Sequence, residues 1–399
     1  MKQIGNTGAE RVGVIGAGTM GRGIAQIAST AGHPVVLVDL NPDVLGAAKM
    51  SLERILNRQA EKGRMTEEQV AGILGRIAYE TGMEGLADAG LVIEAVVENA
   101  GVKSKIFNDL EDVVSKQCWL ATNTSSLSVT ALAATCKHPE RFLGLHFFNP
   151  APLMPLVEVI PALQSLDGLA SSAFDLMSAW GKKPAMAGDT PGFIVNRVAR
   201  PFYGEAIRIM EEGVADHVTI DWAMTALGGF RMGPFTLMDL IGNDINYAVT
   251  ETVWTAFHHD PRYRPSFSQK RNVDAGYLGK KSGRGWYDYS DGAAQKKPRE
   301  DKDLGQDILW RILVMLINEA ADALFWNVAD AEGIDLAMQG GVNYPKGLLA
   351  WADQVGVDRC VAKLDELYTL YGEDRYRCSP KLRQMAQQQL SFRPDLLKT

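Results

Sequence analysis

One histidine and one glutamate are placed where they could take a proton from an alcohol. His146 ends the apolar run 142–145, and Glu158 follows twelve residues later inside a second apolar run, 156–160. If the two runs pair as a hairpin, the carboxylate can hold the imidazole and raise its basicity, as a general base needs. A buried carboxylate also needs a partner, because an unpaired buried charge is costly. A purely structural hydrogen bond at a domain junction is the open alternative.

A glycine-rich turn near the N-terminus has the spacing of a dinucleotide site. Gly16, Gly18 and Gly21 follow a short β-branched strand and open a helix, and the next strand ends at Asp39. In this motif the glycines allow a tight turn, close approach of a pyrophosphate and close helix–strand packing, and the helix N-terminus attracts the phosphates. Asp39 would bind the ribose hydroxyls and repel a 2′-phosphate, which favours NAD over NADP. The alternative is an ordinary glycine-bearing turn.

Other polar side chains lie close to the predicted strand ends. Ser125 belongs to the segment 123–126, whose hydroxyls could bind a nicotinamide amide, a substrate oxygen or only the next helix. Asn149 and Asn196 each follow apolar residues, and by default each is a turn or capping residue.

A basic stripe marks a predicted helix between the second and third strands of the sheet. Arg54, Arg58 and Lys62 recur at intervals of four residues, so they share one helix face. Such a stripe is usually a solvated face, and its functional alternative is a docking surface for the phosphates of a large anionic substrate.

The elements that position these residues form an α/β domain followed by helices. Short apolar runs at 11–15, 35–38, 91–95, 119–122 and 142–146 alternate with helical segments, which predicts a doubly wound parallel sheet. Between the second and third of these strands, a helix over 42–62 and a helix opened by the capping box of Thr66 and Gln69 predict an antiparallel arm.

The second half of the chain contains an internal repeat. Ile220–Met224 recurs as Ile334–Met338, and the same offset of 114 residues relates Glu205 to Glu319. We therefore predict a nucleotide-binding domain over 1–188, a helical domain over 189–290, a linker over 291–304 and a second, degenerate helical copy over 305–399. Like helical domains usually bury their apolar faces against each other.

Composition excludes several classes of protein. The 399 residues carry 41 basic and 48 acidic side chains, a net charge of −7, so a nucleic-acid partner is not expected. No stretch reaches the ~20 apolar residues of a membrane helix. The four cysteines form no Cys-x-x-Cys pair, which suggests neither a disulfide framework nor a metal site. We expect a cytoplasmic protein without a membrane partner.

Taken together, these residues resemble the 3-hydroxyacyl-CoA dehydrogenase family from Arg11 to about Arg383. The resemblance is carried by Gly-Ala-Gly-Thr-Met-Gly (16–21), Val-Ile-Glu-Ala (92–95), Asn-Thr-Ser-Ser-Leu-Ser (123–128), Gly-Leu-His-Phe-Phe-Asn-Pro-Ala-Pro (144–152), Leu-Val-Glu-Val (156–159) and Thr-Pro-Gly-Phe-Ile-Val-Asn-Arg (190–197). With its tandem copy, the chain is most similar to bacterial two-copy members, which act on 3-hydroxybutyryl-CoA or 3-hydroxyadipyl-CoA in fatty-acid and phenylacetate catabolism.

The resemblance implies a role for each candidate residue. His146 would be the general base and Glu158 its orienting partner, while Ser125 and Asn196 would contact the substrate oxygens. The implied cofactor contacts are Gly16, Gly18, Thr19, Met20, Gly21, Asp39, Glu98, Lys103, Ser125 and Asn149. The implied substrate contacts are Arg58 and Lys62 on the CoA moiety, and Ser125 and Asn196 on the acyl chain.

The implied activity is the reversible, NAD-dependent oxidation of a (3S)-3-hydroxyacyl-CoA. The implied helical domains resemble the C-terminal domain of 6-phosphogluconate dehydrogenase, and the two copies would form an internal pseudo-dimer, with a homodimer left open. Asn196 maps onto Trp310 in the second copy, which indicates that this copy is structural. The alternatives are a different Rossmann hydroxyacid dehydrogenase, whose catalytic lysine or cysteine the His146–Glu158 pair disfavours, and a structural or binding protein on the same scaffold.

Overall fold

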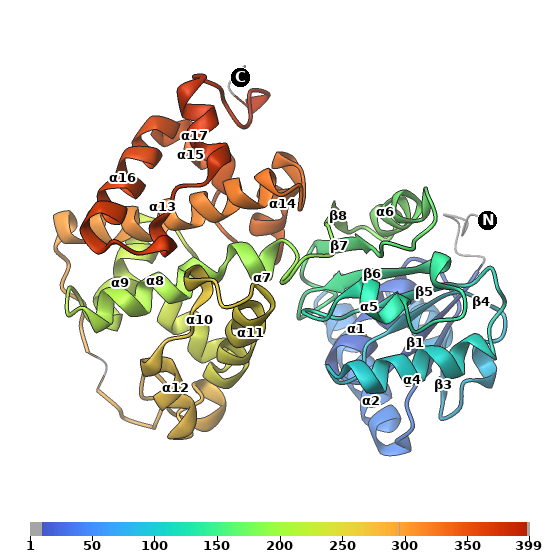
Figure 1. The fold of residues 1–399 in the computed structure, drawn as a ribbon. Helices are drawn as coiled ribbons and strands as arrows, with labels where there is room; N and C mark the ends of the chain where they lie inside the picture. The colour runs from blue at the N-terminus through green and yellow to red at the C-terminus, as the bar shows by residue number, and fades with distance from the viewer. Residues whose placement is uncertain (1–9, 295, 397–399) are drawn as a thin grey trace. The chain divides into compact units, whose positions relative to one another are not determined.

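The computed structural model describes residues 10–294 and 296–396. The chain divides into two compact units, Met1–Thr190 and Pro191–Thr399. Each unit is described by itself (Figure 1). No helix among the described residues is both long and apolar enough to cross a membrane.

The first unit is built on an eight-stranded sheet with the order β3-β2-β1-β4-β5-β6-β7-β8. Its strands are β1 (Arg11–Ile15), β2 (Val35–Val38), β3 (Ile77–Glu80), β4 (Ala89–Glu94), β5 (Trp119–Thr122), β6 (Phe142–Phe147), β7 (Leu156–Pro161) and β8 (Lys183–Met186). All neighbouring pairs are parallel except β6 and β7. The predicted doubly wound sheet is confirmed, and β3 and β8 extend its two edges.

Helices cover both faces of this sheet. They are α1 (Thr19–Thr30), α2 (Pro42–Glu61), α3 (Glu67–Gly75), α4 (Ala100–Glu111), α5 (Val129–Ala133) and α6 (Leu169–Ala179). Residues of α1, α2 and α6 share one buried apolar cluster with alternate strand residues such as Leu143 and Leu145. Because side chains alternate along a strand, Phe142 points to the opposite face, where it meets Phe107 of α4 edge-on at 4.6 Å between ring centroids.

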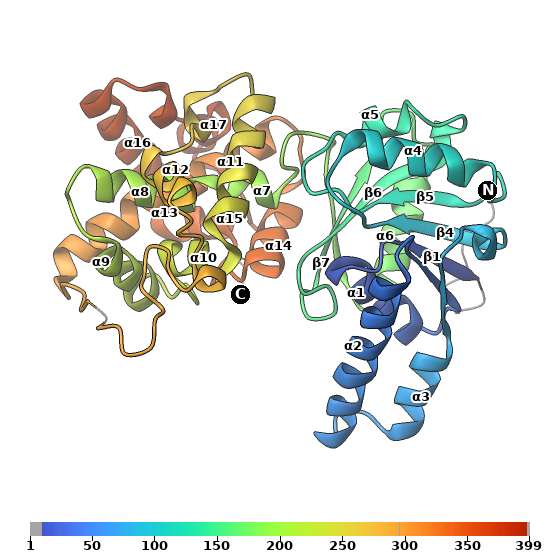
Figure 2. The ribbon, with the colours of Figure 1, turned by 90° about the horizontal axis from the view of Figure 1, so that it is seen from below.

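Helices α2 and α3 form the predicted arm, which projects from the body of the first unit (Figure 2). The capping box is present, since the Gln69 amide donates to Thr66 Oγ1 at 3.1 Å and the Thr66 amide donates to Gln69 Oε1 at 2.9 Å. Leu56, Val70 and Ile73 join the two helices through a small core of their own. The arm is therefore a folded hairpin rather than a loose insertion.

In the second unit the described residues form helices, apart from isolated β-bridges of Arg284 with Gly279 and Asp288. Its α-helices are α7 (Val195–Val198), α8 (Arg200–Glu211), α9 (His217–Trp222), α10 (Pro234–Ile241), α11 (Asn243–Ala256), α12 (Phe267–Asp274), α13 (Lys302–Phe325), α14 (Ala331–Val342), α15 (Leu348–Val355), α16 (Val357–Tyr371) and α17 (Pro380–Gln387). Helices α10 and α15 have bounds that differ by 114 residues at both ends, as the sequence repeat predicts. A buried aspartate holds the start of each, because Asp221 accepts from the Phe235 amide at 2.9 Å and Asp335 accepts from the Leu349 amide at 2.8 Å.

Reciprocal polar contacts join the two helical copies. Arg197 Nε donates to Glu319 Oε1 at 2.7 Å, and its repeat counterpart Arg311 Nε donates to Glu205 Oε1 at 2.6 Å. Tyr263 donates to Glu319, and Tyr376 donates to Glu205 at 2.6 Å. Each copy thus supplies an arginine and a tyrosine to a buried glutamate of the other copy.

Candidate active site

The candidate residues of the first unit follow strands whose carboxyl ends lie along one edge of the sheet. Gly16 follows β1, Glu98 follows β4 and Ser125 follows β5. His146 is the last residue but one of β6. In register, Ile15 pairs with Glu94, and Glu94 pairs with Thr122. Ligands of open α/β sheets bind at this carboxyl edge.

The glycine turn is packed too tightly for side chains. Gly16 has φ +100°, and a Cβ there would lie 2.7 Å from the Ala95 carbonyl oxygen. A Cβ at Gly21 would lie 1.7 Å from the Gly16 carbonyl oxygen, whereas nothing lies within 4 Å of one at Gly18. Gly18 begins α1 without a side-chain cap, and the first turn carries no acid. The first turn of α1 therefore fits phosphate oxygens, which its amides can bind.

Asp39 lies next to this turn. Its Oδ2 accepts from the Ala17 amide at 2.9 Å and its Oδ1 from the Asn41 amide at 3.0 Å. The carboxylate is thus fixed at the end of β2, while each oxygen keeps acceptor capacity for a ribose hydroxyl. The residues present fit an NAD molecule with its pyrophosphate on α1 and its adenosine ribose at Asp39.

The histidine and the glutamate meet as predicted. β6 and β7 pair antiparallel with His146 directly opposite Glu158, and Nδ1 of His146 lies 2.6 Å from Glu158 Oε2. The Glu158 side chain is fully buried, and the His146 side chain is 7% exposed. Phe148 lies against the imidazole at 4.4 Å between ring centroids. A carboxylate on Nδ1 fixes the orientation of the ring, as a general base requires.

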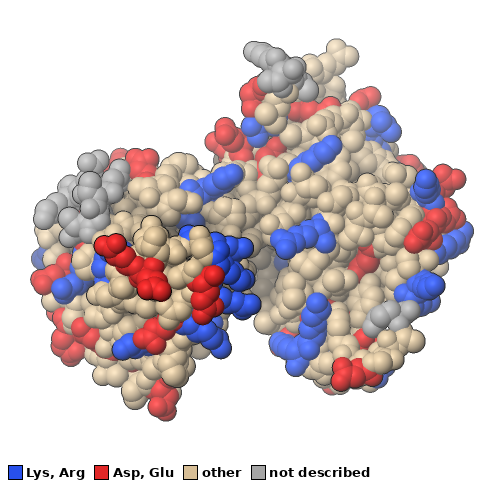
Figure 3. Space-filling model, turned by 180° about the vertical axis from the view of Figure 1, so that it is seen from behind, with Lys and Arg blue, Asp and Glu red and all other residues tan. Residues whose placement is uncertain are grey.

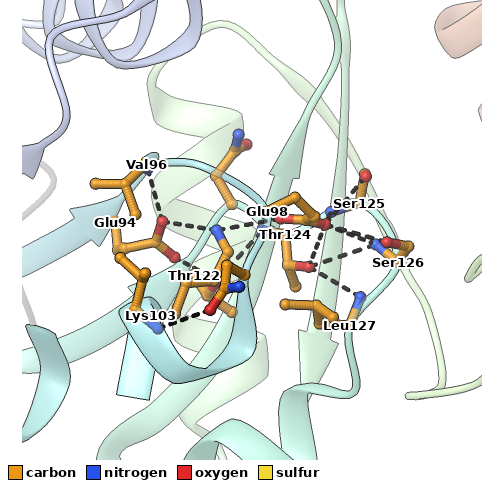
Figure 4. A network of polar contacts seen from close by, with 12 residues as sticks. Glu94, Val96, Glu98, Lys103, Thr122, Thr124, Ser125, Ser126 and Leu127 are labelled. Carbon is orange, nitrogen blue, oxygen red and sulfur yellow. Dashed lines mark hydrogen bonds and ion pairs between the residues drawn. The ribbon is translucent and has the colours of Figure 1, made fainter. Parts of the chain in front are cut away.

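Glu98 organises the loop after β5 (Figure 4). Its Oε1 accepts from Thr124 Oγ1 at 2.6 Å, from the Ser125 amide at 2.8 Å and from Ser125 Oγ at 3.2 Å. Its Oε2 lies 3.2 Å from Lys103 Nζ. Burial by itself would raise the pKa of Glu98, but Lys103 and these donors outweigh it and lower that pKa below its ordinary value. Glu98 is therefore an anion that fixes the position of Ser125.

A buried ion pair between Glu94 and Lys103 adjoins Glu98, and of these two residues only Lys103 was predicted to have a role, as a cofactor contact. Glu94 Oε1 accepts from Lys103 Nζ and from the Val96 amide, each at 2.7 Å, and Glu94 Oε2 accepts from Thr122 Oγ1 at 2.7 Å. The Glu94 and Lys103 side chains are 0% and 1% exposed. Figure 4 shows this pair joined through Lys103 to the Glu98 network. In the sequence, the motif Val-Ile-Glu-Ala puts a charged residue at the end of a buried strand. This is the signal that could have identified Glu94.

Two further residues that sequence reasoning missed hold the loops on this edge. Asn123 Oδ1 accepts from the Phe147 amide at 2.8 Å and so ties the end of β5 to the end of β6. Lys182 Nζ donates to the carbonyls of Ala151 and Met154 at 2.6 and 3.0 Å, in the loop after Asn149. Burial lowers the pKa of Lys182 to about 8. A lone lysine outside any motif gave no signal in the sequence.

The remaining candidates belong to other elements. Asn149 is exposed after β6, and Asn196 is half-buried in α7 of the second unit. Arg58 is exposed on α2, and Lys62 is the exposed C-cap residue of that helix. On the face drawn in Figure 3, basic and acidic side chains are interspersed.

A dinucleotide cradle and a histidine–carboxylate pair on one edge of a doubly wound sheet define a class: dehydrogenases that remove a hydride and a proton from an alcohol. The family models agree. The NAD-binding domain of 3-hydroxyacyl-CoA dehydrogenase matches residues 11–190, and the C-terminal domain of the same enzyme matches twice, at 192–289 and 308–393. The chain belongs to the 3-hydroxyacyl-CoA dehydrogenase family and is an NAD-dependent oxidoreductase.

Similar proteins include some that match nearly the whole chain and some that match about 70% of it. 3-Hydroxyadipyl-CoA dehydrogenase of Escherichia coli K12 is 38% identical over 94% of this chain and 97% of its own length. The crystal structure of an E. coli K12 3-hydroxybutyryl-CoA dehydrogenase matches with a TM-score of 0.90 and 38% identity over 95% of this chain and 98% of that one. Human mitochondrial hydroxyacyl-coenzyme A dehydrogenase is 40% identical over 70% of this chain and 91% of its own.

Proposed function

We propose that the protein oxidises a (3S)-3-hydroxyacyl-CoA to the 3-oxoacyl-CoA reversibly, with NAD as the hydride acceptor. The contact of 2.6 Å between His146 Nδ1 and Glu158 Oε2 is the observation that carries this proposal. With Nδ1 engaged by the carboxylate, Nε2 is the atom that takes the proton of the C3 hydroxyl. Glu158 stabilises the imidazolium that forms, so the proton can leave as the hydride does. Bound NAD supplies the hydride-accepting carbon.

The other site residues position substrate and cofactor in this proposal. Ser125, fixed by Glu98, and Asn196 polarise the C3 oxygen, while Asn149 lies beside the nicotinamide. Gly16 to Gly21 and Asp39 hold the dinucleotide, with Glu98 and Lys103 near its nicotinamide half. Arg58 and Lys62 on the arm bind the CoA moiety through their charge, because CoA carries several phosphate negative charges.

The substrate, the assembly and the location belong to the same proposal. The relatives named above favour 3-hydroxybutyryl-CoA or 3-hydroxyadipyl-CoA as the substrate, and the latter would place the enzyme in phenylacetate catabolism, in the cytoplasm. The reciprocal contacts of Glu205 and Glu319 support an internal pseudo-dimer of the two helical copies, which leaves a homodimer open. The same contacts support the predicted division of the helical half into two domains.

An absorbance assay at one wavelength tests the proposed reaction. With acetoacetyl-CoA as substrate, we expect NADH to be consumed and NADPH to be consumed at least tenfold less efficiently, because Asp39 repels the 2′-phosphate. Equal use of NADPH would contradict the role of Asp39. No consumption of either nucleotide would contradict the proposed reaction and favour a binding or structural role on this scaffold.

A further inference from the structure

Arg200 of the second unit is buried and has no carboxylate partner among the residues that the structure describes. Arg200 is 6% exposed, and burial lowers its pKa below the ordinary value. Its Nε donates to the Asn196 carbonyl at 2.8 Å, and its Nη1 donates to Thr250 Oγ1 at 3.0 Å and, at 3.5 Å, to the Asn246 carbonyl. Within residues 10–294 and 296–396 it forms no ion pair, and its Nη2 takes part in none of these bonds.

The other buried arginines show how unusual this is. Arg141, Arg197, Arg311 and Arg375 are also less than a tenth exposed, and each of them has a glutamate or aspartate within 4 Å. A buried cation without a counter-charge is expensive, because desolvation of the charge is not offset by a neighbouring anion. The exception at Arg200 therefore points to an anion that is not part of the described chain.

Two tyrosines next to Arg200 offer further donors. Tyr203, one turn further along α8, carries the Arg200 guanidinium over its ring at 5.0 Å from the centroid, and it is 4% exposed. Tyr344 lies in the segment between α14 and α15, packs on Phe202 at 5.6 Å between ring centroids, and is 5% exposed. Its hydroxyl is buried without a hydrogen-bond partner in the described part of the chain. Burial and Tyr203 raise the pKa of Tyr344, so it stays a hydroxyl donor.

The cluster therefore consists of one guanidinium and two phenol hydroxyls. Each of these three groups can donate a hydrogen bond. The Tyr344 hydroxyl is buried without a partner among the described residues, and an unmatched buried donor costs free energy. A carboxylate accepts several hydrogen bonds and binds arginine with two of them, so it satisfies this donor set better than water or an amide. The cluster has the composition of a carboxylate site.

Its position relative to Asn196 limits which carboxylate can reach it. Asn196 lies in α7 and Arg200 begins α8, and the Arg200 Nε donates to the Asn196 carbonyl at 2.8 Å, so the guanidinium lies against the backbone of Asn196. In a 3-hydroxyacyl chain of six carbons, the terminal carbon is three bonds beyond C3, which is at most ~4.5 Å. If Asn196 contacts the C3 oxygen, a carboxylate at C6 falls within reach of the guanidinium.

We propose that Arg200, Tyr203 and Tyr344 bind the terminal carboxylate of a dicarboxylic 3-hydroxyacyl-CoA and thereby select such substrates over those that end in a methyl group. This inference rests on the proposed function, because it uses Asn196 as the contact of the C3 oxygen. It also assigns a task to the second helical copy, since Tyr344 comes from that copy while Arg200 and Tyr203 come from the first.

The test compares two substrates of equal length. Wild-type enzyme is assayed with NAD and either 3-hydroxyadipyl-CoA or (3S)-3-hydroxyhexanoyl-CoA, which carries a methyl group in place of the carboxylate. We expect a kcat/KM at least tenfold higher for 3-hydroxyadipyl-CoA. In Arg200→Leu the ratio of the two kcat/KM values should fall about 10²-fold, mainly through KM for the dicarboxylic substrate. Tyr344→Phe removes one hydroxyl, and the ratio should fall about threefold to tenfold.

Taking the ratio cancels any loss that both substrates share, such as one caused by movement of Asn196. Arg208 provides the matched control, because it lies two turns further along α8, its side chain is only 12% exposed, and it already lies 3.5 Å from Glu205. Arg208→Leu should leave the ratio unchanged. If Arg200→Leu is too unstable to assay, Tyr344→Phe decides alone.

The outcomes separate the two proposals. Equal kcat/KM values for the two substrates in the wild type would overturn the carboxylate site. The site would also be overturned if Arg200→Leu lowered kcat/KM equally for both substrates and Tyr344→Phe left the ratio unchanged. Arg200 would then be a support for Asn196. An enzyme that oxidises neither substrate would overturn the proposed function itself.

Discussion

The two helical copies of the second unit are built alike but do not carry the same chemistry. Both copies keep the arginine and the glutamate that join them, at Arg197 and Arg311 and at Glu205 and Glu319. In contrast, Asn196 of the first copy corresponds to Trp310 in the second, where Arg359 lies over the indole at 6.0 Å. The shared positions are therefore those that hold the copies together, and the position proposed to touch substrate is present once.

This difference suggests that the second copy is retained for its surface and for a few side chains that it lends to the first. Its buried glutamate is bound by the first copy, and its Tyr344 packs on Phe202 of α8. A copy that acted as an independent catalytic domain would have needed an amide at position 310. Variants in matched pairs, one from each copy, test this interpretation.

The largest effect is expected at the reciprocal glutamates. Glu319→Gln and Glu205→Gln each remove one charged partner of a buried arginine, while Arg197 keeps Asp322 and Arg311 keeps Glu212. Each variant should therefore lower the free energy of unfolding by about 3 kcal/mol, the lower end of the cost of breaking a buried ion pair. Urea unfolding of the whole chain measures both. Glu366→Gln, at an exposed pair with Lys363, is the control and should change the value by less than about 0.5 kcal/mol. A large loss at only one glutamate would show that the two halves of the contact are not equivalent.

A second pair of variants separates a catalytic role from a structural one. Asn196→Ala should lower kcat by about 10²–10³-fold with acetoacetyl-CoA and NADH, because a donor to the reacting oxygen is lost. Trp310→Ala, at the equivalent position, should leave kcat within about threefold, since no reacting atom is placed there. Steady-state kinetics on both variants decides. A similar loss of kcat in the two would contradict the assignment of the second copy as structural.

The smallest effect concerns the N-caps of α9 and α14. Asp216 caps α9 and lies 2.7 Å from Lys296; burial acts to raise its pKa, but Lys296 and Thr219 lower it to about 2. Because this pKa is depressed in the folded state, the stabilisation is present above about pH 4 and is lost as the pH falls toward 2.

Since Asp216 is partly exposed and its partner Lys296 is largely exposed, the effect is expected to be below about 1 kcal/mol. Urea unfolding of the wild type and of Asp216→Asn at pH 6 and pH 3 measures it. The difference between the two proteins should shrink at pH 3. Asp330→Asn at the other cap, where Asp330 accepts from the Gly333 amide, provides the comparison. A difference for Asp216→Asn that does not depend on pH would contradict the ion pair.

Much of the fold and part of the site could be predicted from the sequence. Strand and helix periodicity gave the sheet, the arm and the repeat, and the spacing of His146 and Glu158 predicted their pairing across a hairpin. Local patterns do not reveal partners that are distant in sequence, which is why the contacts of Lys182 with the loop after Asn149, and of Arg200 with Thr250, were not predicted. The helical repeat predicted that the copies pack together, but not which buried charges meet.

The most direct test of the account replaces the imidazole. His146→Ala should lower kcat for NADH oxidation with acetoacetyl-CoA by about 10²–10⁴-fold, while Kd for NADH, measured by fluorescence titration, stays within about threefold because the glycine turn and Asp39 are untouched. Glu158→Gln should lower kcat less, since the ring remains but loses its charged partner. Turnover by His146→Ala at the wild-type rate would contradict the assignment of His146 as the base.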